Sequence, residues 1–254
     1  METADDNLEG VGRKRNPRKT LILAGVAVAV AVVLLAIYFY HPMKIAPGST
    51  VVVGDFENTT NDPVFNGGLR ELLAAELGQT PFLHAASDEK TGEALRELGQ
   101  EPDAVLTPSL ARQVCNKIGA ADEVKSTIEL TADGYAMLFE VVDCKTGATI
   151  LAEGMTSPDK EHVIDAVARA AAELRKRLGE PRKSLEKHEA SAEALMSKSL
   201  VALQDYAQGR RAEAFAGDET LAAQQYKKAL ALDANFALAR EALERVQAKS
   251  AEAK

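Results

Sequence analysis

The chain has 254 residues, of which 46% are hydrophobic and 27% are charged, as is normal for a globular protein. Its formal net charge of −8 argues against nucleic-acid binding, because neutralising phosphates requires clustered Lys and Arg. Only one basic cluster stands out, in residues 13–19, and it directly precedes a long apolar stretch. A membrane therefore explains this cluster better than a nucleic acid does.

Residues 20–40 have the composition of a transmembrane helix. No charged residue lies between Lys19 and Lys44, and a helix of this length covers about 30 Å, the thickness of a bilayer's hydrocarbon core. A cleaved signal peptide is the alternative, but the stretch is too long for one and no small-x-small cleavage site follows it. Basic residues before the stretch and aromatic residues at its end predict a cytoplasmic amino terminus. We expect a cytoplasmic stub (1–19), an uncleaved anchor and a spacer (41–49), with the rest outside the cytoplasm.

A folded domain is predicted over residues 50–180. The valines at 51–53 predict a strand buried on both faces. Asp62 followed by Pro63 is typical of a helix start, and the glycines at 67–68 in this helix predict close backbone packing. The order of elements predicts an α/β fold, a mixed sheet with packed helices. The predicted strands are 50–56, 82–86, 123–130, 135–144 and 148–153, and the predicted helices are 63–77, 88–98, 108–118 and 157–178.

Residues 181–190 are polar and charged, and we expect a linker there. The Ala-rich segment 191–254 predicts an all-α tail with helices at 191–215, 219–232 and 236–249.

The tail resembles a tetratricopeptide repeat, a helix pair of about 34 residues that stacks on its neighbours. Two positions depart from the family pattern, since Arg210 stands where Gly is usual and Ala234 where Pro is usual. Because a stable solenoid needs about three repeats, we expect the tail to dock on the α/β domain, on another chain or on a second copy. The residues that carry the resemblance are Tyr206, Gly217, Ala222, Tyr226, Ala229 and Leu230.

The α/β region also resembles a known domain, through VVVGDFENTTNDPVFNGGLRELLAAELGQTPFL, then LTPSLARQVCNKIGA and then FEVVDCKTGATI. It is similar to the extracytoplasmic region of bacterial eukaryotic-like Ser/Thr kinases and winged-helix regulators. In those proteins a single anchor precedes a TolB amino-terminal-like α/β domain and tetratricopeptide repeats. This sequence contains neither a kinase motif nor a winged helix, so the resemblance carries over no kinase or DNA-binding activity.

One polar loop, at residues 55–62, follows the first predicted strand, where ligands often bind in α/β folds. The alternative is a tight turn stabilised by Asx hydrogen bonds and a helix cap. The residues in question are Asp55, Asn58, Thr59, Thr60 and Asp62.

Cys115 and Cys144 fall within the sequence blocks that carry the resemblance. A disulfide between them would suit an oxidising compartment, and the alternative is two buried thiols. The four histidines are scattered and form no ligand spacing with the cysteines, so we expect neither a metal nor a cofactor.

Sequence motifs for a catalytic nucleophile, a P-loop or a zinc protease are absent. We therefore expect a non-enzymatic scaffold anchored in the bacterial inner membrane, with its main domain in the periplasm. By the resemblance, the tail helices would bind a protein partner, and a homo-oligomer is an alternative arrangement. A sensor subunit that signals to a separate cytoplasmic effector is the second hypothesis, and a cryptic hydrolase is the third. The candidate partner-binding residues of the tail are Tyr206, Tyr226, Leu230 and Phe236.

Overall fold

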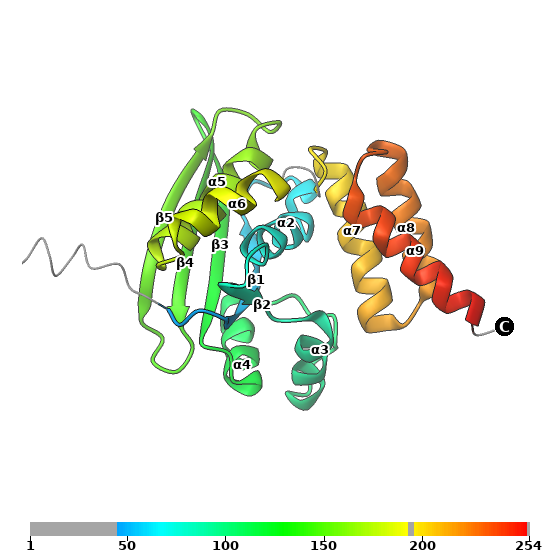
Figure 1. The fold of residues 1–254 in the computed structure, drawn as a ribbon, viewed down its shortest axis with the longest axis horizontal. Helices are drawn as coiled ribbons and strands as arrows, with labels where there is room; N and C mark the ends of the chain where they lie inside the picture. The colour runs from blue at the N-terminus through cyan, green and yellow to red at the C-terminus, as the bar shows by residue number, and fades with distance from the viewer. Residues whose placement is uncertain (1–44, 193–195, 253–254) are drawn as a thin grey trace, which may run out of the picture. The chain divides into compact units, whose positions relative to one another are not determined.

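The computed structural model in Figure 1 describes residues 45–192 and 196–252. The predicted stub (1–19) and anchor (20–40) lie outside the described residues, as do residues 41–44 of the predicted spacer. Within the two described ranges, no helix combines the length and the apolar composition needed to cross a bilayer.

Five strands form one mixed sheet in the order β2-β1-β3-β4-β5. Strand β1 is parallel to both of its neighbours, β2 and β3, whereas β3, β4 and β5 form an antiparallel meander. The structure thus confirms a mixed α/β architecture. The strands span Ser49–Asn58 (β1), Leu83–Ala85 (β2), Asp122–Thr131 (β3), Gly134–Asp143 (β4) and Thr149–Ser157 (β5).

Helices cover both faces of the sheet around β1. Helices α2 and α5 pack on one face, while α4 packs on the other face with α3 beside it (Figure 1). The predicted burial of the three valines is confirmed, because Val51 and Val53 belong to the core under α2 and α5, and Val52 belongs to the core beside α4. These helices span Gly68–Leu77 (α2), Asp88–Glu97 (α3), Pro108–Ile118 (α4) and Val163–Arg177 (α5), and a 3₁₀ turn, Pro63–Phe65 (η1), precedes α2.

The tail docks on the α/β domain, the first of the three arrangements expected from the sequence. Helix α7 packs against α2 on one side and against α8 on the other (Figure 1). The apolar side chains of the tail and those under α2 and α5 form one continuous core. The tail consists of Leu200–Arg211 (α7), a π-helical segment at Ala212–Ala216 (η2), Glu219–Leu232 (α8) and Ala237–Glu252 (α9).

The glycines at 67–68 have the packing role that the sequence predicted. A Cβ atom on Gly68 would lie 3.0 Å from the backbone N of Gln204 and 3.0 Å from the backbone C of Leu203. Gly67 adopts a φ of 78°, which glycine reaches at no steric cost. The helix predicted over 63–77 is therefore split, because the chain turns at Gly67 before α2 begins.

Two boundaries around α5 differ from the prediction. The helix expected from residue 157 begins at Val163, because β5 continues to Ser157, which pairs with Tyr135 of β4. The segment expected as a linker (181–190) instead forms Arg182–Ala192 (α6). This stretch consists largely of good helix formers, but Leu185 is the only aliphatic residue larger than Ala in α6, so it shows no apolar period.

The first tail helix also starts later than predicted. The sequence favoured a helix from residue 191, but α7 begins at Leu200, and Ser199 caps it by accepting a hydrogen bond from the backbone N–H of Ala202. Ser197, two residues before this cap, is buried and donates a hydrogen bond to Asp233 at 2.7 Å, which favours a non-helical conformation of this stretch.

Candidate functional site

The polar loop after β1 forms a turn and a helix cap. Asn58 accepts hydrogen bonds from the backbone N–H and the hydroxyl of Thr60, at 3.0 and 2.7 Å. Asp62 accepts one from the backbone N–H of Val64 and forms an ion pair with Lys160. The hydrogen bond from Lys160, with that from Val64, lowers the pKa of Asp62.

The other two residues of this candidate loop are also bonded within the protein. Asp55 accepts a hydrogen bond from the backbone N–H of Leu106 at 2.8 Å, and the Thr59 hydroxyl donates to the carbonyl of Ile128 at 3.3 Å. The sequence alternatives were a ligand loop and a structural turn, and these contacts fit the structural turn.

Cys115 and Cys144 form a disulfide, with 6.0 Å between their Cα atoms. The bond ties α4 to the turn after β4, and both residues are buried. Asn116 reinforces the same junction, since its side-chain amide donates to the carbonyl of Cys144 at 2.9 Å.

The tail residues expected to meet a partner lie inside the protein. The rings of Tyr206, Tyr226 and Phe236 are buried and contact one another, with centroid distances of 5.7 Å for the two tyrosines and 4.9 Å between Tyr206 and Phe236. Leu230 is partly buried against the same core. These four side chains therefore join α7, α8 and α9, and a partner would have to bind other faces of the tail.

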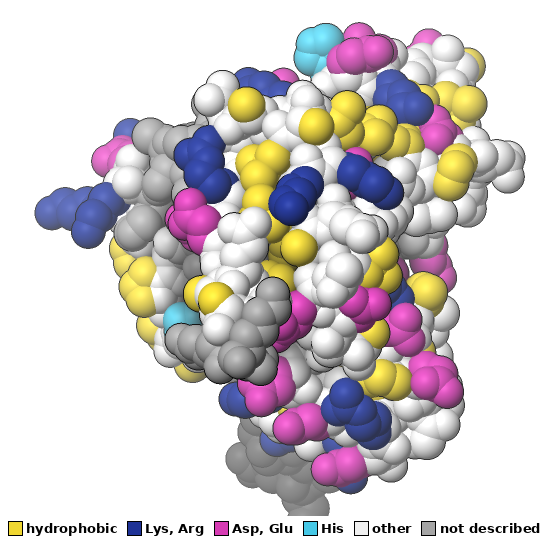
Figure 2. All heavy atoms as spheres, turned by 90° about the vertical axis from the view of Figure 1, so that its right-hand side faces the viewer, with side chains coloured by type: hydrophobic (Ala, Val, Ile, Leu, Met, Phe, Trp, Pro, Cys, Tyr) yellow, Lys and Arg dark blue, Asp and Glu magenta, His cyan; other side chains and the backbone are white. Residues whose placement is uncertain are grey.

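The free face of the tail is mixed in character. Figure 2, which looks onto the side where the tail lies, shows hydrophobic atoms interspersed with charged side chains of both signs. Three large apolar side chains of the tail, Val201, Leu221 and Leu232, are exposed.

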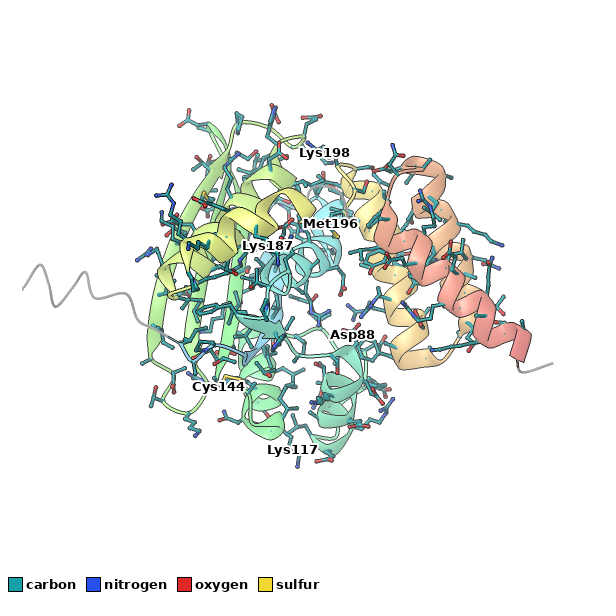
Figure 3. The ribbon with its side chains drawn as sticks, in the orientation of Figure 1. Asp88, Lys117, Cys144, Lys187, Met196 and Lys198 are labelled. Carbon is teal, nitrogen blue, oxygen red and sulfur yellow. A yellow bond between two sulfur atoms is a disulfide. The ribbon has the colours of Figure 1, made fainter. Side chains whose placement is uncertain are left out.

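A cluster of charged side chains, which the sequence did not predict, lies where α2, α3 and α7 meet. Asp88, the first residue of α3 (labelled in Figure 3), forms ion pairs with Arg210 of α7 and with Arg70 of α2. Arg70 also pairs with Glu71 at 2.7 Å and donates to the carbonyl of Val53 at 3.1 Å. Burial raises the pKa of Glu71, although the neighbouring Arg70 opposes the rise. The one sequence signal for this cluster was Arg210 at the family's usual Gly position.

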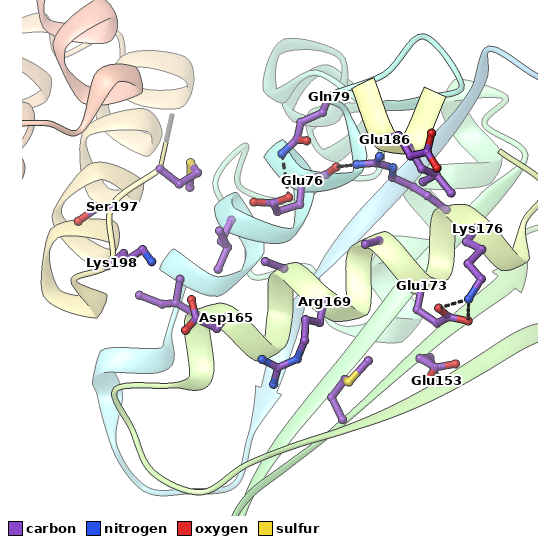
Figure 4. A pocket seen from close by; sticks show the side chains of 18 of the residues that line it. Glu76, Gln79, Glu153, Asp165, Arg169, Glu173, Lys176, Glu186, Ser197 and Lys198 are labelled. Carbon is purple, nitrogen blue, oxygen red and sulfur yellow. Dashed lines mark hydrogen bonds and ion pairs between the residues drawn. The ribbon is translucent and has the colours of Figure 1, made fainter. Parts of the chain in front are cut away.

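A groove with a volume of about 920 Å³ runs along α5. Figure 4 shows the side chains that line it. Helix α2 and the segment 196–198 form one side, and α6 and strand β5 contribute the rest of the lining. Two small residues of α5, Ala168 and Ala172, leave room over the helix. The larger apolar side chains of the lining are Leu72, Met155, Ile164, Leu185 and Met196.

Charges of both signs alternate along the groove. On α5, Asp165 and Glu173 alternate with Arg169 and Lys176, and Figure 4 shows the ion pair between Glu173 and Lys176, at 2.9 Å. For Arg169, which is exposed, the structure gives no hydrogen bond or ion pair. The groove thus has an apolar floor with charged side chains above it, some of them in ion pairs and others not. A partner that carries both apolar and charged groups would fit this surface.

One end of the groove is fixed by a buried ion pair. Arg175 pairs with Glu180 at 2.7 Å and donates to the backbone carbonyl of Glu76 at 3.0 Å. Both charged side chains are at least 97% buried, so removing one of them would leave an uncompensated charge in the core.

Among the described side chains that line the groove there is no nucleophile–base pair. Ser197 supplies the one hydroxyl among them, and it donates to Asp233 and accepts from the backbone N–H of Ser199 at 3.0 Å. These described lining residues include neither His nor Cys. Across the part of the chain that the structure describes, no group of three His, Cys, Asp or Glu side chains is placed to hold a metal ion.

No protein-family model matches the chain, and no curated protein matches it either. Among solved structures, the LpoB C-terminal domain from Salmonella enterica has a TM-score of 0.41 at 22% identity, over 44% of this chain and 84% of that domain. A PelC dodecamer structure from Paraburkholderia phytofirmans has a TM-score of 0.35 at 14% identity, over 54% of this chain and 92% of the PelC chain.

TolB from Acinetobacter baumannii, the protein whose amino-terminal domain this sequence resembles, is also among these structures. Its TM-score is 0.32 at 14% identity, over 53% of this chain and 28% of TolB. Each of these likenesses is partial, and none of them carries a function over to this chain.

Proposed function

We propose that this chain is a single-pass bacterial membrane protein whose folded part lies outside the cytoplasm and binds a protein partner without catalysing a reaction. The anchor rests on the apolar stretch 20–40 and its basic flank. The Cys115–Cys144 disulfide supports an oxidising location, because such bonds persist outside the cytoplasm and are rare within it.

The observation that carries the binding role is the groove along α5. A small-molecule site is usually enclosed and mostly apolar with a few polar groups, whereas this groove is open and carries charges of both signs. Ala168 and Ala172 expose the surface of α5, so a segment of another protein has room to lie along it. The free guanidinium of Arg169 would then pair with an acidic group of that segment.

The tail has a supporting role in this proposal. Its first residues, Met196 and Lys198, line the groove, and α7 is packed on α2 beside it. The ion pair between Arg210 and Asp88 holds the tail in this position. The tail would thus shape the binding site rather than present its buried aromatic side chains to a partner.

Site-specific photo-cross-linking in cells tests this function. The photoreactive amino acid benzoyl-phenylalanine replaces Ala172 in the groove, and in a matched control it replaces Lys227, an exposed residue of α8. We expect a discrete protein adduct from position 172 and none from position 227. Arg169→Glu should reduce the adduct at 172 severalfold without changing the amount of protein in the membrane. Equal adducts at both positions, or none at 172, would overturn the proposal.

A further inference from the structure

Strand β5 forms one end of the sheet, so one of its sides has no neighbour among the described strands (Figure 1). Residues 151–157 pair with β4 in unbroken register. In an antiparallel pair, alternate residues turn their backbone N–H and C=O groups toward the neighbouring strand and away from it. The carbonyl of Ala152 points away from β4, because it accepts a hydrogen bond from Arg177 at 3.0 Å. The backbone groups of Gly154 and Thr156 therefore point the same way, and within the described residues no hydrogen bond reaches them.

This edge carries few of the features that keep other strands away. Native edges are commonly protected by Lys, by Pro, by a bulge or by a covering element. The residues that point outward, Ala152, Gly154 and Thr156, are instead small and exposed. Glycine weakens the interior of a strand and often marks a place where another backbone approaches closely. A Cβ atom on Gly154 would meet nothing within 4 Å among the described atoms, so the described fold itself does not require this glycine.

Charges on α5, which packs on β5, alternate in sign. Every fourth residue along one side of the helix is charged, in the order Asp165, Arg169, Glu173 and Arg177. Glu173 and Arg177 each have an ion-pair partner in the chain. For Asp165 and Arg169 the structure gives no ion pair within the described residues. These two charges, one of each sign, are therefore available to a partner.

We infer that a second copy of this chain binds at this edge, with the two β5 strands antiparallel about a twofold axis at Met155. This inference rests on the proposed function and names its partner. An antiparallel copy reverses the order of charges on α5, so Asp165 lies opposite Arg177 of the second copy and Arg169 lies opposite its Glu173. A strand from a different protein could also pair with β5, but α5 itself already carries the reversed order of charges that this position requires.

The free backbone groups determine the register of the two strands. With the axis at Met155, Gly154 of each copy exchanges hydrogen bonds with Thr156 of the other, and the two Met155 side chains meet on the face that α5 covers. An axis at Gly154 would instead require the carbonyl of Ala152, which already accepts a side-chain hydrogen bond. In the register with the axis at Met155, Ala152 lies opposite Pro158, which has no N–H to donate.

Disulfide formation at the axis tests this pairing in the full detergent-solubilised chain. In this register Met155→Cys places two thiols on Cα atoms about 4.5 Å apart, within the range that a disulfide spans. Cys115 and Cys144 are bonded to each other and do not compete. Mild oxidation should therefore give a covalent dimer. Ala152→Cys is the matched control on the same strand, because the two Cα atoms would lie about 20 Å apart, and it should stay monomeric.

Further changes in the Met155→Cys protein separate strand pairing from charge pairing. Thr156→Pro removes an outward N–H and should reduce the dimer severalfold, while the neighbouring residues still bond β5 to β4. R169E should also reduce it severalfold, because it places two acidic side chains opposite each other. Adding E173R restores opposite charges and should recover the dimer. K227E, at an exposed position of α8, is the control and should have no effect.

The outcomes separate this inference from the proposed function. Equal amounts of dimer from Met155→Cys and Ala152→Cys, or no recovery with E173R, would overturn the inference. A photo-cross-linked adduct at position 172 whose mass is not twice that of the chain would also overturn it, and would leave the proposed function standing. Failure of the proposed function would be seen separately, as the absence of any adduct at position 172.

Discussion

Arg210 of α7 and Asp88 of α3 form an ion pair across 122 residues of sequence, and the pair joins the helical tail to the α/β domain. The side chain of Asp88 is 9% exposed and also faces Arg70 at 3.5 Å. The neighbouring Arg211 donates to the carbonyl of Asp103, and the Phe215 ring lies close to Gly92 of α3. Arg210, which stands where the repeat pattern that the tail resembles usually has Gly, therefore fixes its helix to a partner within the same chain.

Replacing Arg210 with Ala should lower the free energy of unfolding by about 2 kcal/mol. Removing one member of a buried ion pair costs more, about 3–5 kcal/mol, but the Arg210 side chain is 32% exposed and water screens part of the interaction. Denaturant unfolding of the detergent-solubilised protein measures this loss.

Arg182→Ala is the matched control, because Arg182 forms an ion pair with Glu186 while its side chain is 90% exposed. An exposed pair of this kind contributes less than about 0.5 kcal/mol. Similar losses for the two variants would mean that Arg210 is no more than a surface charge.

Gly68→Ala should destabilise the protein although Ala is the better helix former. The gain in helix propensity is about 1 kcal/mol, but the new Cβ would press against the backbone of α7 at 3.0 Å, and overpacking costs about 1–3 kcal/mol. Gly154→Ala is the control, because its Cβ would meet nothing within 4 Å. Thermal unfolding should show a midpoint below that of the unmodified protein for Gly68→Ala but not for Gly154→Ala. A midpoint above that of the unmodified protein for Gly68→Ala would contradict the close approach of α2 and α7.

The sequence predicted the elements that depend on local signals. The start at Pro63 lies where the capping side chain of Asp62 precedes a proline, and α4, which matches the predicted helix 108–118, begins in the same way after Thr107. The predicted strands 123–130 and 135–144 correspond to β3 and β4, which a short turn at Asp133 and Gly134 joins. Helix α6 was missed because a single leucine, Leu185, gives no period to detect. The ends of β5 and α5 were set by pairing with β4, a partner that is distant in sequence.

The functional surfaces were harder to predict than the elements. The groove combines side chains from α2, β5, α5, α6 and residues 196–198, and no single stretch of sequence carries its pattern. Tyr206, Tyr226 and Phe236 were read as partner-binding because sequence does not distinguish an aromatic side chain in a helical core from one in a groove. Arg210 departs from the repeat pattern in the sequence, but its partner Asp88 can be identified only from the fold.

Glu213 should make the stability of the tail depend on pH. Burial acts to raise its pKa, but hydrogen bonds from Arg245 and Tyr226 outweigh this and lower the pKa to about 2. Because the folded pKa lies below the ordinary value of 4.5, the stabilisation is fully present above that value and is lost as the pH falls toward 2. At pH 7 it amounts to about 2 kcal/mol, because solvent screening at this partly exposed carboxylate reduces the roughly 3 kcal/mol that the change in pKa alone would give.

At pH 7, Glu213→Gln should therefore have a lower free energy of unfolding than the unmodified protein. The difference in free energy between the two should become smaller below pH 4.5. Glu241→Gln, an exposed position in α9, is the control and should show no such difference. Urea titrations at pH 7, 5 and 4 measure both variants, and a gap that widens toward acid would contradict the assignment.

Loss of the disulfide should cost about 3 kcal/mol, because Cys115 and Cys144 close a loop with a sequence separation of 29 residues. The variant with Ala at both positions should be less stable by this amount and insensitive to reductant. Adding reductant should bring the unmodified protein to the stability of the variant. If the stability of the unmodified protein were the same with and without reductant, the bond would not be formed.

The proposed function depends on the folded part lying outside the cytoplasm, and a pair of reporter fusions after residue 254 tests this most directly. Alkaline phosphatase is active only where its own disulfides form, and an enzyme that works only in the cytoplasm provides the opposite readout. We predict phosphatase activity with no cytoplasmic activity for the full chain, and the reverse when residues 20–40 are deleted. Cytoplasmic reporter activity from the full chain would contradict the account.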